Sequence, residues 1–452
     1  MKEWKKEQEI LVAGAGRSGI NAVRLLLAKG YRPVLYDGNA GLDREQLKEK
    51  LQGDCPILLG ELPEEGLKER YQCCVISPGI PLTAPFAAAL KQAGVPIISE
   101  ISLAWRFHQG KLAAVTGTNG KTTTTSLLGH ILSAVYPDTF VVGNIGHAWS
   151  IEVAGSHPGS ATVAEISSFQ LETLEEGFAP EVTIITNLTP DHLDRHGTVE
   201  NYYNLKKSIA AGQAAAGFCV VNREDPLLQD MPGKTKAKVL YFSSARELEE
   251  GTFLKDGRLM LRLNGKEEAL CETSALRIVG THNYENAAAA SLAAALLGVP
   301  TEIIRRQLLS FTAVEHRIEY VCTKNGVEYF NDSKGTNPDA AIKGIEAMTG
   351  PTVLLGGGYD KHSDYTDWVK CFKGRVKLLL LMGATARDIA DCVDKVCPVP
   401  YRFVKDMEEA VAIAKEAAEP GDKVLLSPAC ASWGMYPDFE VRGRHFKDLV
   451  RQ

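Results

Sequence analysis

The 452-residue sequence lacks a long apolar run, a Cys-x-x-Cys pair and a strong excess of charge of either sign. A membrane-spanning helix needs about 20 consecutive apolar residues. The most apolar stretch, residues 287–299, is shorter and rich in alanine, which is typical of a buried helix. The ten cysteines form no Cys-x-x-Cys pair, so buried, reduced thiols are expected. The net charge of −6 argues against a binder of nucleic acid. We therefore expect a cytoplasmic protein with no nucleic-acid or membrane partner.

Short apolar runs alternate with helical segments along the chain, which is typical of parallel α/β layers. A chain of this length holds two to four domains of about 100–200 residues each. The strand-like runs fall into three groups, which predicts three domains: residues 1–105, 106–312 and 313–452. We expect a Rossmann-like N-terminal domain, a central P-loop ATPase-type domain and a Rossmann-like C-terminal domain. Ligands are expected beyond the carboxyl ends of the strands.

The first glycine-rich loop is Gly14-x-Gly16-x-x-Gly19, between an apolar run and a predicted helix. Such glycines permit a tight turn and a close approach of the backbone to a pyrophosphate at the helix N-terminus. Asp37 ends the next predicted strand, where dinucleotide-binding folds carry an acidic residue. The pattern indicates a phosphate-bearing nucleotide, without identifying it. A tight turn that only packs the strand against the helix stays an alternative.

The second glycine-rich loop is Thr116-Gly117-Thr118-Asn119-Gly120-Lys121-Thr122-Thr123, again between a predicted strand and a helix. In a P-loop the backbone N–H groups surround phosphates, so Lys121 would meet the β and γ oxygens and Thr122 would bind Mg²⁺. The spacing is unusual, because Val115 stands where the common pattern has glycine. The Gly-Lys-Thr core still predicts phosphate binding, since a plain turn would not need a lysine followed by four threonines.

Carboxylates and one histidine follow two further predicted strands of the central region. Glu165 follows one strand, and Asp191, His192 and Asp194 follow the next. Oxygen ligands with one imidazole suit Mg²⁺ or Mn²⁺. Any one of these residues alone would more often be solvated or structural. Beside a P-loop, the set favours metal or nucleotide binding.

Three polar loops follow predicted strands of the third region, at residues 331–338, 356–361 and 427–432. Each places a hydroxyl group or a cation at the end of a strand, and each could by itself be an ordinary turn. Three such loops on one sheet indicate a binding face for an anionic small molecule. Cys430 has no activating pattern beside it, so a structural role is the better interpretation.

With these motifs in place, the chain resembles the Mur ligase family over nearly its whole length. The resemblance rests on segments in this order: AGAGRSG, SPGIP, VTGTNGKTTT, VGNIG, AEISSFQLE, ITNLTPDHLDRHG, GTHNYENAAAA, EHRIE, FNDSKGTNPDA, LLGGGYDK and LSPACASWGMYPDFEVRG. The resemblance implies an ATP-dependent amide-bond ligase of peptidoglycan precursor synthesis that uses ATP and two Mg²⁺ ions. Within the family, the short first domain and the GGGYDK and LSPACAS loops are similar to the branch that adds D-glutamate to UDP-N-acetylmuramoyl-L-alanine through an acyl phosphate.

The resemblance also implies a role for individual residues. Lys121, His192 and Lys206 would be catalytic, and the metal ligands would be Thr122, Glu165, His192 and Lys206 as a carbamate. The predicted ATP contacts are Gly117, Thr118, Asn119, Gly120, Lys121, Thr122, Thr123, Asn283, Arg317 and Asp332. The predicted contacts of the UDP-substrate are Gly16, Arg17, Ser18, Asp37, Ser77, Gly79, Asn144 and Gln170. The predicted contacts of D-glutamate are Lys334, Thr336, Lys361, Ser432 and Phe439.

Lys206 receives two different interpretations. Residue physics alone predicts a solvated helix face for Lys206 and Lys207, whereas the resemblance implies a carbamate that bridges metals, with Lys207 as the alternative position. The chain departs from many relatives at Gly434, where they carry an acidic residue, and at Tyr436, where they carry phenylalanine. These departures weaken the expected support of the loop 432–439.

Two other functions stay open at this point. One is a related ligase of the folylpolyglutamate synthase type. The other is an NAD-dependent dehydrogenase, in which Gly14–Gly19 and Asp37 would bind the dinucleotide. The resemblance further implies a monomer.

Overall fold

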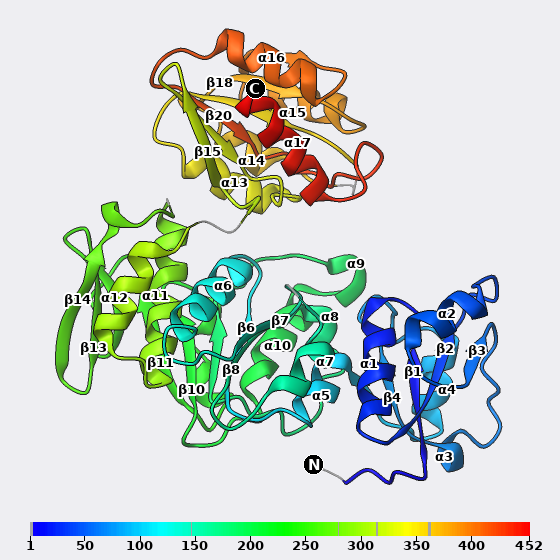
Figure 1. Ribbon diagram of the computed structural model, residues 1–452. Coiled ribbons are helices and arrows are strands. Elements are labelled where there is room, and N and C mark those ends of the chain that lie inside the picture. The colour runs from blue at the N-terminus through cyan, green and yellow to red at the C-terminus, as the bar shows by residue number, and fades with distance from the viewer. Residues whose placement is uncertain (1–2, 146, 279, 313–314, 360–362) are drawn as a thin grey trace. The chain divides into compact units, whose positions relative to one another are not determined.

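The computed structural model describes residues 3–145, 147–278, 280–312, 315–359 and 363–452, and Figure 1 shows the chain as a ribbon. Three sheets follow one another along the sequence. The chain divides into two compact units, Met1–Glu272 with Glu285–Leu308 and Thr273–Tyr284 with Leu309–Gln452. The predicted α/β class with three successive domains is confirmed, while the exact boundaries at 105 and 312 stay predictions. No described helix has the length and apolarity to span a bilayer.

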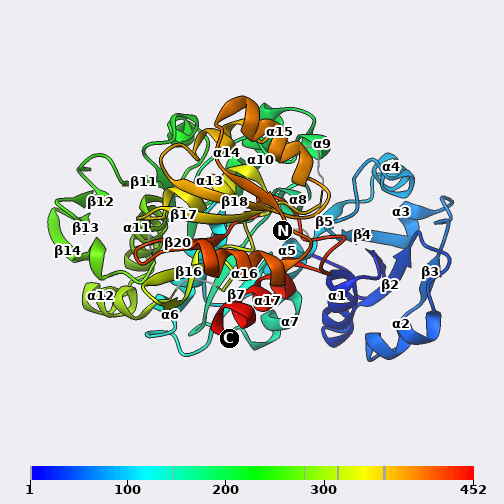
Figure 2. The same ribbon diagram turned by 90° about the horizontal axis from the view of Figure 1, so that it is seen from above.

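The first sheet has five parallel strands in the order β3-β2-β1-β4-β5. Ile10 and Val12 of β1 pack into one core cluster and Leu11 and Ala13 into another, because alternate residues of a strand point to opposite faces. Helices α1 and α2 cover one face, and α3 and α4 cover the other (Figure 2). The elements are β1 (Glu9–Ala13), α1 (Arg17–Ala28), β2 (Arg32–Asp37), α2 (Arg44–Leu51), β3 (Ile57–Leu59), α3 (Leu67–Arg70), β4 (Tyr71–Ile76), α4 (Pro85–Gln92), β5 (Ile97–Ser99) and α5 (Glu100–Trp105).

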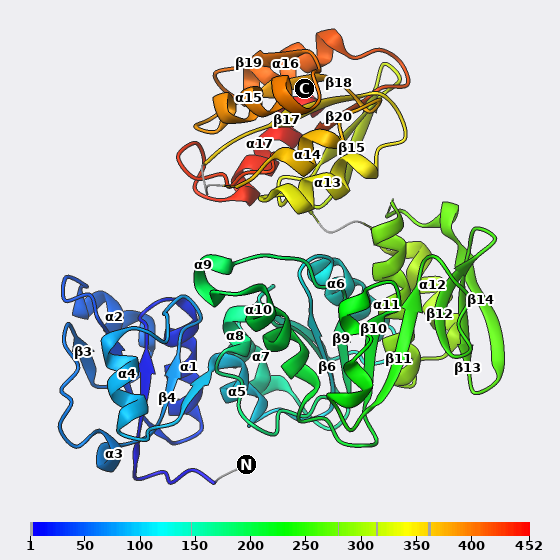
Figure 3. The ribbon, with the colours of Figure 1, turned by 180° about the vertical axis from the view of Figure 1, so that it is seen from behind.

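The second sheet has nine strands in the order β14-β13-β12-β11-β10-β9-β6-β8-β7. The pairs from β7 to β12 are parallel, and β13 and β14 add an antiparallel ribbon at one edge, next to α12 (Figure 3). The strands are β6 (Lys111–Thr116), β7 (Thr139–Gly143), β8 (Ala161–Glu165), β9 (Val182–Ile185), β10 (Phe218–Asn222), β11 (Lys238–Ser243), β12 (Gly251–Lys255), β13 (Arg258–Leu263) and β14 (Lys266–Glu272). The helices are α6 (Lys121–Leu132), α7 (Trp149–Glu152), α8 (Ser168–Leu171), α9 (Leu193–His196), α10 (Val199–Lys207), α11 (Thr281–Leu296) and α12 (Thr301–Ser310).

The third sheet has the order β15-β16-β20-β17-β18-β19 and is parallel except for β15 at its edge. Because β16, β20 and β17 are neighbours, the loops that follow them meet at one edge of the sheet. The elements are β15 (Glu319–Lys324), β16 (Val327–Asn331), α13 (Pro338–Glu346), β17 (Thr352–Gly356), α14 (Thr366–Lys370), β18 (Val376–Leu381), α15 (Ala386–Val396), β19 (Tyr401–Phe403), α16 (Met407–Ala417), β20 (Lys423–Leu426) and α17 (Phe439–Arg451).

Candidate active site

The loop between β6 and α6 has the strand–loop–helix geometry of a phosphate-binding loop. Gly117 and Gly120 have φ of +142° and +83°, which L side chains rarely adopt. A Cβ on Gly117 would lie 1.9 Å from Thr186 Oγ1, and one on Gly120 would lie 2.3 Å from Asn286 Oδ1. The loop therefore requires both glycines, and the first turn of α6 presents its N–H groups as in anion sites at helix N-termini.

A second layer of polar side chains holds the loop in this shape. Thr118 N donates to Asn187 O at 2.9 Å, and Asn119 N donates to Asn187 Oδ1 at 2.9 Å. Thr186 Oγ1 donates to Asn119 O at 2.5 Å, and Thr124 Oγ1 donates to Asn286 Oδ1 at 3.2 Å. The loop is thus pre-shaped by the segment after β9 and by α11.

Sequence reasoning missed Asn187 and Asn286, although each stands in one of the motif segments. Asn286 is three residues after the predicted Asn283, which places both on one side of α11. Helical spacing was the signal that could have found it. Asn283 itself is buried, and its predicted contact with ATP stays a prediction.

Two lysines converge on one carbonyl group of the loop. Lys121 Nζ donates to Gly117 O at 2.9 Å and to Thr118 O at 2.8 Å, and Lys206 Nζ donates to Gly117 O at 2.7 Å. Lys206 is 1% exposed, so its interpretation as a solvated lysine is wrong. Burial, and after it the nearby Lys121 cation, hold the pKa of Lys206 well below its usual range, partly opposed by Asp191 and Glu165.

Lys207 is also buried, but on a different partner. Its ammonium group contacts both carboxylate oxygens of Asp230, at 2.7 and 2.8 Å. The solvated interpretation is wrong for this lysine too. Lys206 thus faces the phosphate-binding loop, whereas Lys207 is held in an ion pair, so Lys206 is the better placed of the two for a carbamate.

Glu165 at the end of β8 is a buried carboxylate with one unused oxygen. Asn144 Nδ2 donates to Glu165 Oε1 at 2.8 Å. Glu165 Oε2 is buried, and among the described residues it has no hydrogen-bond partner. An unpaired buried carboxylate oxygen is costly unless a cation or donor meets it, so this atom fits a hard divalent cation.

His192 lies on the loop before α9 in a left-handed conformation, with φ of +53°. Its ring packs edge-to-face on Phe169 with centroids 4.8 Å apart, and its backbone N–H donates to Asp191 Oδ1. The side chain is 45% exposed, so it is accessible to a ligand. Within the described residues His192 and Glu165 make no direct contact with each other. The side chain of Asp194 lies outside the described residues.

The glycine loop of the first domain borders a cleft of about 1290 Å³, which Gly14, Gly16, Asp37, Ser77 and Phe86 help to line. Ser77 Oγ is buried there without a hydrogen-bond partner among the described residues. Asp37 Oδ2 accepts from Ala15 N at 2.8 Å, and Oδ1 accepts from Asn39 N at 2.9 Å. Asp37 thus supports the loop that would hold a phosphate.

The other predicted contacts of a UDP-substrate lie on loops and helix ends. Arg17 and Gly79 are exposed and Ser18 is half-buried at the start of α1. Gln170 is buried in a capping box at the start of α8, where its Oε1 accepts from Ser167 N at 2.9 Å. The capping box holds the Gln170 side chain in place, and its Oε1 is already used as an acceptor by Ser167.

In the third domain, Asp332 is fully buried at the end of β16. Ser427 Oγ donates to its Oδ2 at 2.7 Å, and Ile318 N donates to its Oδ1 at 3.3 Å. Burial raises the pKa of Asp332 to about 6, although the Arg317 cation works in the opposite direction. Two residues predicted to contact ATP, Asp332 and Arg317, are therefore close in space.

Four of the predicted D-glutamate contacts lie at the carboxyl edge of this sheet. Lys334 Nζ lies 5.5 Å from the centroid of the Phe439 ring. Thr336 N donates to Lys334 O, and Ser432 is 4% exposed after β20. The fifth, Lys361, lies outside the described residues.

Arg442 is a buried cation that sequence reasoning missed. It is 2% exposed, and its partners within the described residues are uncharged oxygens: Ser333 Oγ at 2.9 Å, Ser333 O at 2.8 Å and Cys430 O at 3.2 Å. Burial lowers the pKa of Arg442 to about 10. Its position in the RG pair of the last motif was the available signal. Through these hydrogen bonds Arg442 connects the loops after β16 and β20 to α17.

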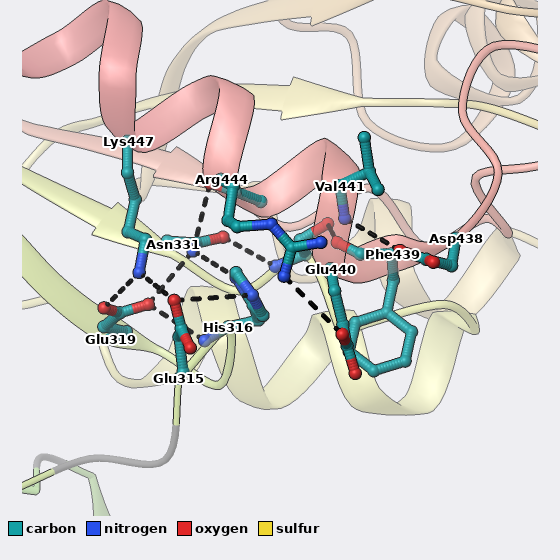
Figure 4. A network of polar contacts seen from close by, with 12 residues as sticks. Glu315, His316, Glu319, Asn331, Asp438, Phe439, Glu440, Val441, Arg444 and Lys447 are labelled. Atoms are coloured by element: carbon teal, nitrogen blue, oxygen red, sulfur yellow. Dashed lines mark hydrogen bonds and ion pairs between the residues drawn. The ribbon is translucent and has the colours of Figure 1, made fainter.

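A polar network at the start of the third domain fixes the segment that carries Arg317 (Figure 4). Lys447 Nζ contacts Glu315 Oε1 at 2.5 Å and Glu319 Oε1 at 2.9 Å, and Asn331 Nδ2 donates to His316 Nδ1 at 2.8 Å. His316 and Ile318 have φ of +66° and +46°, so this segment is strained and needs such support.

These features first define a class. A pre-shaped phosphate-binding loop on a parallel sheet, beside a buried lysine and a buried carboxylate and within a chain of three α/β domains, defines a multidomain P-loop nucleotide-binding protein.

Comparison with known proteins then identifies the family. Residues 8–99 match the Mur ligase MurD-like N-terminal domain, residues 115–294 match the Mur ligase middle domain, and residues 316–430 match the Mur ligase glutamate ligase domain. The chain belongs to the Mur ligase family. The resemblance inferred from the motifs is confirmed.

Among curated relatives, the UDP-N-acetylmuramoylalanine--D-glutamate ligase of Lachnospira eligens is 49% identical, over 98% of this chain and 99% of the relative. The protein of that name from Lachnoclostridium phytofermentans is 47% identical over 98% of both chains. Among solved structures, UDP-N-acetylmuramate-alanine ligase MurC from Thermotoga maritima has a TM-score of 0.60 at 19% identity, covering 98% of this chain and 99% of that one. Mycobacterium tuberculosis folylpolyglutamate synthase has a TM-score of 0.58 at 13% identity, over 75% and 91%. The structural matches support the fold.

Proposed function

We propose that this chain is the ATP-dependent ligase that joins D-glutamate to UDP-N-acetylmuramoyl-L-alanine, in the synthesis of peptidoglycan precursors. The observation that carries the proposal is full-length identity of 42–49% to curated ligases of that name, together with the phosphate-binding loop around Gly117. We further propose that it acts as a cytoplasmic monomer, which fractionation and light scattering would test.

The central domain would hold ATP and Mg²⁺. The loop Gly117–Thr123 would surround the phosphates, and Lys121 would turn from its own loop carbonyls to the γ oxygens. Thr122 and Glu165 offer oxygen ligands to Mg²⁺, and His192 offers an accessible imidazole. When bound, ATP and Mg²⁺ supply the phosphoryl group that activates the substrate carboxylate and the charge that stabilises its transfer.

Lys206 suits modification to a carbamate. A neutral amine attacks CO₂ and releases one proton, which leaves an N-bound carboxylate. The depressed pKa of Lys206 keeps more of the amine neutral near pH 7, and the nearby Lys121 cation would stabilise the anion that forms. The modified side chain would offer oxygen ligands to the metals beside Glu165.

The first and third domains would bind the two other substrates. The cleft at Gly14–Gly16, with the unpartnered Ser77 hydroxyl, offers donors to a diphosphate. Lys334, Thr336 and Ser432 offer a cation and hydroxyl groups to the carboxylates of D-glutamate. The amine of D-glutamate would attack the acyl phosphate and displace phosphate, which gives the amide, ADP and inorganic phosphate.

The dehydrogenase alternative is disfavoured by the match of residues 115–294 to the Mur ligase middle domain and by the full-length ligase relatives.

The test is phosphate release by the full chain with UDP-N-acetylmuramoyl-L-alanine, ATP and Mg²⁺, with and without D-glutamate. Release that depends on D-glutamate and yields the UDP-linked dipeptide is expected. Release that responds instead to L-alanine, meso-diaminopimelate or L-glutamate would show that the acceptor is wrong. Binding of UDP alone by calorimetry separates this function from that of a folate-type ligase.

A further inference from the structure

The loop 432–438, between the end of the 427–432 segment and α17, carries one side chain whose hydroxyl group reaches the body of the domain. Tyr436 O–H lies 2.8 Å from His445 Nδ1 on α17, and the two rings have centroids 5.8 Å apart. His445 Nε2 lies 3.2 Å from Glu408 Oε1 on α16. These contacts form a relay from the loop through α17 to α16.

One arrangement of protons satisfies the whole relay. The Tyr436 hydroxyl group can donate to Nδ1 of His445 while Nε2 of the same ring donates to Glu408. Burial, together with the Glu408 charge, raises the pKa of Tyr436 to about 12, so the phenol keeps its proton and stays a donor at neutral pH. Both polar contacts are therefore satisfied at once.

The same residue also closes the turn that holds Ser432. Tyr436 N donates to Ser432 O at 2.9 Å, and Met435 N donates to the same oxygen at 3.3 Å. Between them Gly434 adopts φ of +85°, and an added Cβ there would meet no described atom within 4 Å. Gly434 gives the centre of the turn no side-chain packing. Met435 and Tyr436 both pack on the core cluster that contains Phe446 of α17, and the Tyr436 hydroxyl group adds a hydrogen bond to that helix.

We propose that Tyr436 is a positioning residue for the amino-acid acceptor, which holds the Ser432 turn through its hydrogen bond to His445. The proposal rests on the proposed function, because that function places D-glutamate at Ser432 and Phe439. The hydrogen bond to His445 supplies the turn with support that Gly434, which has no side chain, cannot give.

The experiment compares Tyr436→Phe with the wild-type chain and with Tyr401→Phe as the matched control. Tyr401 is in the same domain and loses a hydroxyl bond to Asp394 at 3.1 Å, away from the Ser432 turn. Removal of one net hydrogen bond corresponds to a factor of about 2–12. Tyr436→Phe should therefore raise KM for D-glutamate by about 2- to 10-fold, with KM for ATP and for the UDP-substrate unchanged and kcat within about 2-fold. Tyr401→Phe should change none of these constants.

Hydrogen exchange provides a readout that does not depend on turnover. Amides of residues 433–438 should exchange faster in Tyr436→Phe than in the wild type, and those of β17 and β20 should not. His445→Leu removes the same Tyr436–His445 bond and, in addition, the contact of His445 with Glu408. It should speed exchange in 433–438 at least as much, and adding Tyr436→Phe to it should give no further change, because the shared bond is already lost.

Several outcomes would overturn the proposal. These are an unchanged KM for D-glutamate, an equal rise in KM for all three substrates, or exchange in 433–438 that equals the wild type. If the wild-type chain does not use D-glutamate, the proposed function fails first, and this result is visible before any variant is made.

Discussion

The Lys206 ammonium group donates to the Gly117 carbonyl oxygen at 2.7 Å, so a lysine from α10 is fixed to the phosphate-binding loop 89 residues away in the sequence. Lys121 reaches the same oxygen at 2.9 Å. Two lysine side chains therefore meet at one carbonyl group, one of them fully buried, and an anion between them would be stabilised by both. The first prediction follows from this relationship.

Lys206→Ala should lower turnover by at least about 100-fold, the effect of losing a group that stabilises developing charge in a closed site. Lys207→Ala is the matched control, because this neighbour pairs with Asp230 and does not face the loop; it should keep turnover within about 3-fold. Steady-state phosphate release measures both. Full turnover in Lys206→Ala would refute a role for this lysine.

The carbamate itself predicts a dependence on dissolved CO₂. Wild-type enzyme that has been purged of CO₂ should lose activity and regain it when bicarbonate is added. A carbonyl resonance from ¹³C-bicarbonate should appear in the wild type and in Lys207→Ala but not in Lys206→Ala. Activity that ignores bicarbonate, with no resonance, would contradict the modification.

Gly16 and Gly19 should respond differently to alanine. A Cβ on Gly19 would lie 1.8 Å from Gly14 O, so Gly19→Ala must push α1 off the loop and should lower the free energy of unfolding by about 1–3 kcal/mol. A Cβ on Gly16 would meet no described atom within 4 Å, so Gly16→Ala should unfold like the wild type but bind UDP more weakly. Thermal unfolding and UDP calorimetry measure the two effects. Equal unfolding behaviour of both variants would contradict the packing argument.

Asp332 predicts a pH-dependent gain of stability for its amide variant. The folded-state pKa of about 6 lies above the ordinary value of 3.8, so the protonated carboxyl is favoured by folding. This contribution is complete below pH 3.8 and is lost as the pH rises through 6. From pH 4 to pH 8 the free energy of unfolding of Asp332→Asn should therefore rise by about 2.5 kcal/mol relative to that of the wild type. The variant should also lose ATP-dependent activity. Urea unfolding at the two pH values measures the difference, and a difference that does not change with pH would refute the raised pKa.

Gly443 should be irreplaceable for steric reasons. A Cβ at this position on α17 would lie 2.2 Å from His316 Nδ1. Gly443→Ala should displace His316 from Asn331, lower stability by about 1–3 kcal/mol and weaken ATP binding through the adjacent Arg317. Urea unfolding measures the loss of stability, and nucleotide titration measures the weaker ATP binding. Wild-type values for both would mean that α17 can move away without consequence.

The sequence allowed prediction of those parts of the site whose residues are contiguous. The loop 116–123 carries its own strand, glycines and lysine, so local spacing identified it. Glu165 ends a strand of the sheet that carries the phosphate-binding loop, and the rule that ligands sit at carboxyl ends was enough to select it. Asp332 directly follows a strand, but its predicted role in binding ATP came from the resemblance to the family.

The missed parts depend on contacts between distant segments. Asn187 and Arg442 act through backbone groups of other loops, and such pairings leave no periodic signal. Burial of Lys206 could not be predicted from the sequence of α10 alone, because its environment comes from the phosphate-binding loop. Strands β13 and β14 escaped prediction because charged residues at their outward positions break the apolar runs that mark the parallel strands.

The charges on β14 have a consequence for the behaviour of the whole molecule at high concentration. This strand ends the nine-stranded sheet and leaves a row of backbone groups without a neighbouring strand. Lys266, Glu267 and Glu272 are exposed along it, and the last two pair with Arg262 and Arg258 of β13. A second copy that added its own β14 would have to desolvate these ion pairs. The exposed charges thereby protect the open edge against strand-to-strand aggregation.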